Sequence, residues 1–126
     1  MFNRRGLLQL GTLGALSLPQ LLALLARATA LLTPDSGPAH MATMVGLPVL
    51  GLYAATNLER SGPYYSRRWC VSAYDAASRK FLQKPAIELP WTQKIERPGV
   101  MELIEVDMVT ARLDELMALR PEARLP

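Results

Sequence analysis

One short run, Asp35-Ser36-Gly37-Pro38-Ala39-His40, contains the side chains best suited to bind a charged ligand. Asp35 and Ser36 are of the types that cap helix N-termini, and Gly37 allows a close approach of the backbone. Pro38 suits the first turn of a helix. The unpaired amides at such a helix start form an anion site, because that end carries a partial positive charge. We therefore predict that this turn binds a diphosphate.

The turn requires a strand before it and a helix after it. Apolar residues 30–32 end at the turn signal, which indicates a buried strand. The helix that starts at Pro38 is expected to end near Gly46, where a left-handed residue is favoured, with Pro48 just beyond. Residues 49–53 are again apolar and predict the next strand. Strand, turn, helix and strand form one βαβ unit, in which ligands bind at the carboxyl ends of the strands.

With its flanks, this run resembles glycosyltransferase family 9, the ADP-heptose:lipopolysaccharide heptosyltransferase family. The matching features are Asp-Ser/Thr-Gly-x-x-His at 35–40, a small-residue helix, Gly-x-Pro at 46–48, the apolar strand at 49–53 and Thr-Asn at 56–57. The resemblance extends from about Leu18 to the C-terminal helix. It covers less than half of a full family member, which has two Rossmann-like domains in the GT-B arrangement.

The resemblance implies both a fold and an activity. The fold is α/β, a partial Rossmann-like domain with a small parallel sheet, equivalent to the C-terminal half of a GT-B glycosyltransferase. The activity is transfer of a sugar from a nucleotide diphosphate donor, ADP-heptose or a similar nucleotide sugar, to lipopolysaccharide core. No cofactor and no metal are expected. The implied partners are this donor and a lipopolysaccharide acceptor at the inner membrane surface, so the implied location is cytoplasmic and peripheral to that membrane.

The resemblance also implies which residues bind the donor: Asp35, Ser36, Gly37, His40, Thr56 and Asn57. It assigns no catalytic residue, because the general base of the family is an acidic residue of the N-terminal domain. Residues 1–17 contain no counterpart of that base. We therefore expect the chain alone to show negligible transferase activity.

Each of these residues also has a purely structural interpretation. On the turn alone, helix capping by Asp35 or Ser36 is the simpler role, and only the flanking pattern favours ligand binding. His40 is the only histidine. A helix start favours its neutral form, so we interpret it as a binding residue and not as a base. Donor contact and turn formation are equally supported for Thr56 and Asn57.

Composition excludes several other classes. A chain of 126 residues allows one domain, and a hydrophobic content of 50% excludes disorder. The single cysteine, Cys70, excludes an internal disulfide and, with one histidine, argues against a zinc site. We expect Cys70 to be a buried apolar residue. Net charge is only +3 and aromatic residues are few, so nucleic-acid binding is not expected. Arg60, Arg67 and Arg68 are expected to be ordinary loop residues.

The N-terminal residues allow three interpretations. Arg4-Arg5 followed by apolar residues resembles a twin-arginine export signal covering residues 1–30, with cleavage after Ala30. The uncharged stretch 6–26 has the length of a membrane span, although Pro19 disfavours one. Alternatively, Ser17 caps an ordinary helix whose apolar face contains Leu18, Leu21, Leu22 and Leu25.

We divide the chain into a foreign or signal-like segment 1–16, a partial GT-B C-terminal domain 17–120 and a tail 121–126. After a loop at 54–68 we expect a short strand at 69–71, either a short helix or a solvated connection at 73–84, and one helical turn at 98–102. Asp107 is expected to cap a last helix whose inner face contains Val109, Leu113, Leu116 and Met117.

A partial sheet has an uncovered edge, so self-association is expected. The alternative function is a non-catalytic remnant, truncated or exported, that binds nucleotide weakly or not at all.

Overall fold

A computed structural model describes residues 7–9 and 16–126 of the chain. Its centre is a sheet of four parallel strands in the order β1-β2-β3-β4. The strands are β1 (Leu7–Gln9), β2 (Ala30–Pro34), β3 (Val49–Tyr53) and β4 (Val71–Ser72). The predicted α/β class with a small parallel sheet is therefore confirmed.

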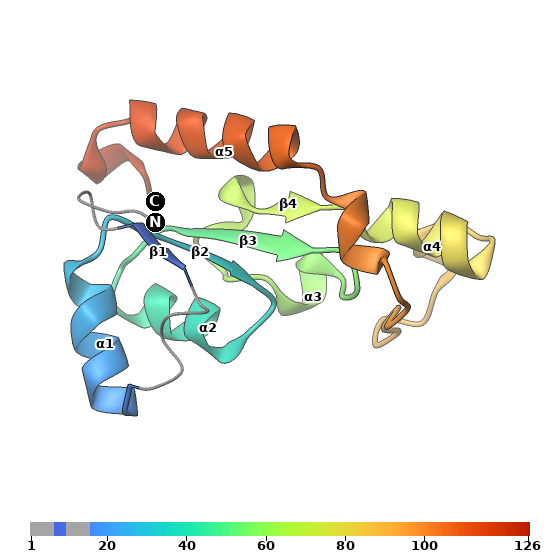
Figure 1. Cartoon of the computed structure of the whole chain (residues 1–126), viewed down its shortest axis with the longest axis horizontal. Coiled ribbons are helices and arrows are strands. Elements are labelled where there is room, and N and C mark those ends of the chain that lie inside the picture. Colours follow the sequence, from blue (N-terminus) through green and yellow to red (C-terminus); the bar gives the residue numbers. More distant parts are fainter. Residues whose placement is uncertain (1–6, 10–15) are drawn as a thin grey trace.

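Helices cover both faces of this sheet. α1 (Leu18–Arg27) and α2 (Gly37–Met44) lie on one face, and α5 (Val106–Ala118) crosses the other (Figure 1). α3 (Leu58–Ser61) follows β3, and α4 (Tyr74–Leu82) follows β4 near the carboxyl ends of the strands. Short 3₁₀ helices form at Arg67–Trp69 (η2), Ala86–Glu88 (η3), Val100–Leu103 (η4) and Pro121–Ala123 (η5).

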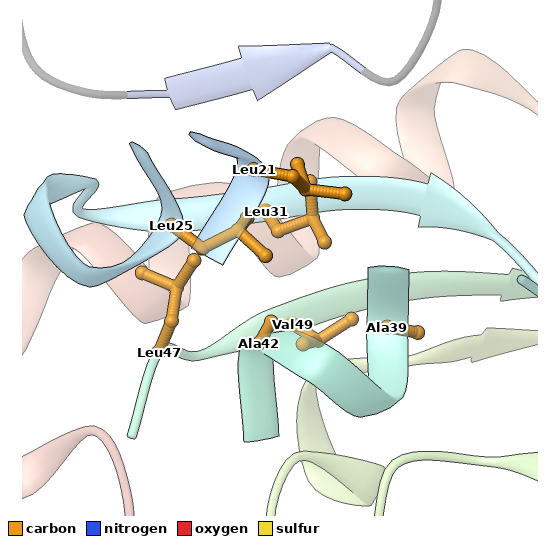
Figure 2. Close-up of a cluster of buried hydrophobic side chains, with 7 residues drawn as sticks. All are labelled: Leu21, Leu25, Leu31, Ala39, Ala42, Leu47 and Val49. Atoms are coloured by element: carbon orange, nitrogen blue, oxygen red, sulfur yellow. The ribbon is translucent and has the colours of Figure 1, made fainter. Parts of the chain in front are cut away.

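The larger core cluster lies between α1, α2 and the sheet. Figure 2 shows its side chains: Leu21, Leu25, Leu31, Ala39, Ala42, Leu47 and Val49. The two alanines of α2 are fully buried, and their small size allows the helix to lie close to the strands. On the opposite face, Ala30, Trp69 and Leu116 form a second cluster. Neighbouring residues Ala30 and Leu31 thus face opposite layers, as the pleat of a strand requires.

The start of α1 forms as predicted. Ser17 Oγ accepts a hydrogen bond from the Gln20 amide at 3.4 Å, and Gln20 Oε1 accepts one from the Ser17 amide at 3.0 Å. Leu21 and Leu25 are buried. Leu18, predicted for the same face, is instead 68% exposed because it belongs to the first turn, whose neighbouring residues face solvent.

The end of α2 also forms as predicted. Gly46 has φ +72°, a left-handed conformation that glycine adopts without strain. The Leu47 amide donates to Ala42 O at 2.9 Å, which satisfies a carbonyl at the end of the helix. The chain therefore reverses at Gly46-Leu47-Pro48 and enters β3 at Val49.

Several predicted boundaries in the C-terminal part were wrong. The strand expected at 69–71 starts at Val71, because the Trp69 amide donates to Ser66 O and closes η2. The loop expected at 54–68 contains α3. The N-cap of α5 is Glu105 and not Asp107, which lies within the first turn. Of the two alternatives for 73–84, the helix is present as α4, and Leu116 is buried on the predicted inner face of α5.

β1 lies within the segment 1–16 that was expected to be foreign or signal-like. It pairs in parallel with β2 in the register Leu7 to Ala30 and Gln9 to Leu32. Arg4 and Arg5 of the export-signal motif lie outside the described residues, so that interpretation stays a prediction. No helix in the described part of the chain combines the length and the apolar character needed to span a bilayer.

Replacing Leu25 by alanine tests the packing of α1 against the sheet. Leu25 is fully buried, whereas Leu24 on the same helix is 37% exposed. We expect Leu25→Ala to lower the free energy of unfolding by about 2–5 kcal/mol, through lost transfer free energy and a cavity. Leu24→Ala should cost less than about 1 kcal/mol. Urea unfolding of both variants measures this, and equal losses would contradict the assigned core.

Candidate functional site

The predicted turn lies at the carboxyl ends of β2 and β3. Thr56 Oγ1 donates a hydrogen bond to Asp35 Oδ2 at 2.8 Å, which joins the loop after β2 to the loop after β3. The structure thus brings Asp35 and Thr56 together at the sheet edge where parallel α/β proteins bind ligands. This bond also orients the Asp35 carboxylate.

Ser36 occupies the N-cap position of α2, but its side chain does not cap the helix. Its Oγ lies 2.9 Å from Oγ1 of the buried Thr33, and this contact directs the hydroxyl back toward β2. The structural alternative considered for Ser36, capping of the helix by its side chain, is therefore not formed. Pro38 has no amide N–H, and the Ala39 amide donates to Ser36 O at 3.2 Å. The amides of Ser36 and Gly37 are the remaining candidates to bind an anion.

Gly37 borders open space. A Cβ atom built at this position would have no heavy atom within 4 Å, and the backbone is not left-handed. Neither packing nor conformation within the described structure therefore explains the glycine. An approach of a ligand to the backbone would explain it.

The remaining two predicted residues lie beside this turn. His40 is exposed on α2 and has no hydrogen bond to another described residue. Asn57 Oδ1 accepts from the Glu59 amide at 3.0 Å and caps α3, so the structure shows the turn-forming role for Asn57. Donor binding by His40 and Asn57 stays a prediction.

A cavity of about 240 Å³ opens beside the Asp35–Thr56 pair. Its lining residues come from the ends of β2 and β3 and from the connection between α4 and α5: Pro34, Asp35, Leu52, Ala54, Ala55, Thr56, Lys94, Glu96 and Met101. The sequence analysis missed the last three. The only signal in the sequence for this segment was Ile95, an apolar residue between the charged residues Lys94 and Glu96.

A larger cavity of about 420 Å³ lies at the opposite, amino-terminal edge of the sheet. Gly46, Leu47 and Pro48 line it together with residues 121–126 that follow α5. It contains none of the predicted site residues. We assign the functional site to the 240 Å³ cavity, because it lies at the carboxyl edge, where parallel sheets bind ligands, and because Asp35 and Thr56 line it.

The loop arginines make contacts within the chain. Arg67 donates to Glu59 O at 2.7 Å and forms an ion pair with the Glu59 carboxylate at 3.5 Å. The Arg68 guanidinium lies 4.2 Å from the centre of the Trp69 ring and donates to Ala123 O at 2.7 Å. These contacts give Arg67 and Arg68 a structural role.

Cys70 and Tyr53 are buried titratable side chains that pack against β3. Burial raises the pKa of the Cys70 thiol to about 11, and Sγ donates to Ser66 O at 3.4 Å. Burial also raises the pKa of Tyr53, with smaller contributions from Cys70 and Asp35. Both groups are therefore neutral at physiological pH, and the prediction that Cys70 is buried is confirmed. Among the described residues, no three Cys, His, Asp or Glu side chains converge as metal ligands.

Comparison with known proteins gives two findings. Residues 5–92 match the family model described as glycosyltransferase family 9 (heptosyltransferase). Over 103 residues the chain is 42% identical to the lipopolysaccharide core heptosyltransferase OpsX of Haemophilus influenzae. The aligned part covers 82% of this chain and 30% of that protein, so the chain spans about 30% of the relative's length. No solved structure matches the chain.

Cys70 should react slowly in the folded protein. Because the pKa rises from 9.0 to about 11, the thiolate fraction at pH 8 falls about 100-fold relative to the unfolded chain. We expect a thiol reagent to modify the native chain at least about 100-fold more slowly than the chain in urea. Equal rates in the two states would contradict the buried thiol.

The same pKa shift predicts a dependence of stability on pH. Folding favours the protonated thiol, so its contribution is complete below pH 9 and is lost as pH rises toward about 11. We expect Cys70→Ala to reduce the decline in the free energy of unfolding over this range. Urea unfolding at several pH values measures it, and an unchanged decline would contradict the prediction.

Proposed function

The chain belongs to glycosyltransferase family 9, and from this premise we propose that it is the donor-binding part of a glycosyltransferase of lipopolysaccharide core assembly. The proposed donor is ADP-heptose or a similar nucleotide diphosphate sugar. The name of the 42% identical relative supports this donor and acceptor class. The chain spans only about 30% of that relative, so activity, donor and acceptor are all proposed here.

The observation that carries the proposal is the arrangement around the start of α2. Thr56 Oγ1 donates a hydrogen bond to Asp35 Oδ2 at 2.8 Å, and Gly37 borders open space. In our proposal the diphosphate of the donor lies against the amides of Ser36 and Gly37. The missing side chain at Gly37 lets a phosphate oxygen approach the backbone, and the dipole of α2 favours its negative charge.

This arrangement suits the chemistry of glycosyl transfer. When the bond between the sugar carbon and the phosphate oxygen breaks, its electron pair passes to the departing nucleotide diphosphate. Groups that are fixed where this charge develops lower the barrier. The amides of Ser36 and Gly37 are fixed by the helix. Asp35, oriented by Thr56, would accept a hydrogen bond from a sugar hydroxyl, and His40 would bind another group of the donor.

Donor and acceptor together suggest a location and partners. Nucleotide sugars are made in the cytoplasm, and the core acceptor is built at the inner membrane. We therefore propose action at the cytoplasmic surface of that membrane. Self-association through a sheet edge, formed in the described structure by β1 or β4, remains a further part of the proposal.

Calorimetry with ADP tests the donor site. We expect the chain to bind ADP, Ser36→Ala to weaken binding by removing the hydroxyl whose contact with Thr33 fixes the turn, and His40→Ala to weaken it about 10-fold, the loss expected for one hydrogen bond to a charged group. Thr43→Ala is the matched control, because Thr43 lies at the other end of α2 and its hydroxyl donates to Ala39 O.

Absence of ADP binding by the unaltered chain would refute the proposal and favour the non-catalytic remnant. Equal weakening by Ser36→Ala and Thr43→Ala would indicate general damage to α2, and would not support a site at its N-terminus.

A further inference from the structure

The connection between α4 and α5 is anchored against the end of the sheet (Figure 1). Ile95 is 1% exposed and packs in a cluster with Ala54 and Tyr74. The Ile95 amide donates to Ala55 O at 2.8 Å, and Tyr74 Oη donates to Gln93 O at 2.6 Å. Two hydrogen bonds and one buried side chain thus fix the connection beside the loop that contains Thr56.

Lys94 and Glu96 flank the buried Ile95 and are exposed. Both line the 240 Å³ cavity that also contains Asp35 and Thr56. Neither takes part in any of the three ion pairs found among the described residues. An ammonium group and a carboxylate therefore border the cavity with their hydrogen-bonding capacity available to a ligand.

We propose that Lys94 and Glu96 complete the donor site, with Lys94 binding the diphosphate and Glu96 accepting hydrogen bonds from hydroxyl groups of the donor. The inference rests on the proposed function and extends it to a second segment of the chain. It assigns two donor-binding residues that lie outside the Asp-Ser-Gly turn.

Charge balance supports the role of Lys94. Asp35 lines the cavity, and a carboxylate repels a neighbouring diphosphate. The amides of Ser36 and Gly37 provide only partial positive charge. Lys94 is the only basic residue that lines this cavity in the described structure, so its ammonium group supplies the one full positive charge there that attracts a diphosphate. The ammonium is a point charge suited to phosphate oxygens.

The chemistry of a nucleotide sugar supports the role of Glu96. An ionised carboxylate only accepts hydrogen bonds, and a sugar or ribose offers several hydroxyl donors. Phosphate oxygens offer none. Within one cavity, Lys94 therefore suits the phosphate part of the donor and Glu96 suits its hydroxyl-bearing part.

The role of Lys94 is tested by calorimetry with ADP as the probe. We expect Lys94→Ala to weaken ADP binding at least about 10-fold and to reduce its salt dependence, and Lys94→Arg to retain most of the affinity. Lys84→Ala is the matched control, since Lys84 is exposed on the same connection but does not line the cavity.

The role of Glu96 is tested with ADP-glucose and ADP side by side. We expect Glu96→Gln to weaken the binding of one or both ligands about 5-fold or more. Glu88→Gln, an exposed control on η3, should leave both affinities unchanged.

The outcomes separate this inference from the proposed function. If the unaltered chain binds ADP and Lys94→Ala binds it equally well, the inference is overturned and the proposed function stands. If the unaltered chain binds no ADP, both are overturned. If Lys84→Ala weakens binding as much as Lys94→Ala, the effect reflects general surface charge, and the assignment to the cavity is overturned.

Discussion

The parallel pairing of β2 with β3 is the constraint on which the site depends. Its register runs from Leu31 opposite Val49 to Pro34 opposite Leu52, so the two strands end at the same edge of the sheet. Asp35 follows one strand end and the loop with Thr56 follows the other. Their hydrogen bond of 2.8 Å is a consequence of this register. A slip of one residue would reverse the facing of every side chain in β3 and separate the pair.

Packing around β3 depends on a glycine. Gly51 lies in the middle of β3 beneath the ring of Tyr53; a Cβ on Gly51 would lie 2.6 Å from a ring carbon of Tyr53 and 3.1 Å from Cys70 Sγ. The glycine thus makes room for the buried ring of Tyr53.

The sequence predicts the elements whose signals are local. β2, α2, β3 and the reversal at Gly46 follow from an apolar run, a turn and a left-handed glycine, and these elements place Asp35 and Thr56 correctly. Features set by tertiary contacts are missed. The Ser36 hydroxyl contacts Thr33, a competing partner that capping rules do not consider. β4 starts later than predicted because η2 precedes it, and Trp69 of η2 packs with Leu116 of α5. Lys94 and Glu96 are missed because only the burial of Ile95 brings them to the cavity.

The electrostatics around the site depend on which side chains are charged. Burial keeps Cys70 protonated and raises the pKa of Tyr53, so neither of these groups on and beside β3 carries a charge at physiological pH. The field at the cavity is then set by Asp35, Lys94, Glu96 and the N-terminus of α2. Two carboxylates and one ammonium alone would favour a cationic ligand. A diphosphate group can therefore bind only if it contacts the N-terminus of α2 and Lys94, while hydroxyl groups of the same ligand donate hydrogen bonds to the carboxylates of Asp35 and Glu96. This arrangement selects a ligand that carries both phosphate and hydroxyl groups, which distinguishes a nucleotide sugar from a simple anion.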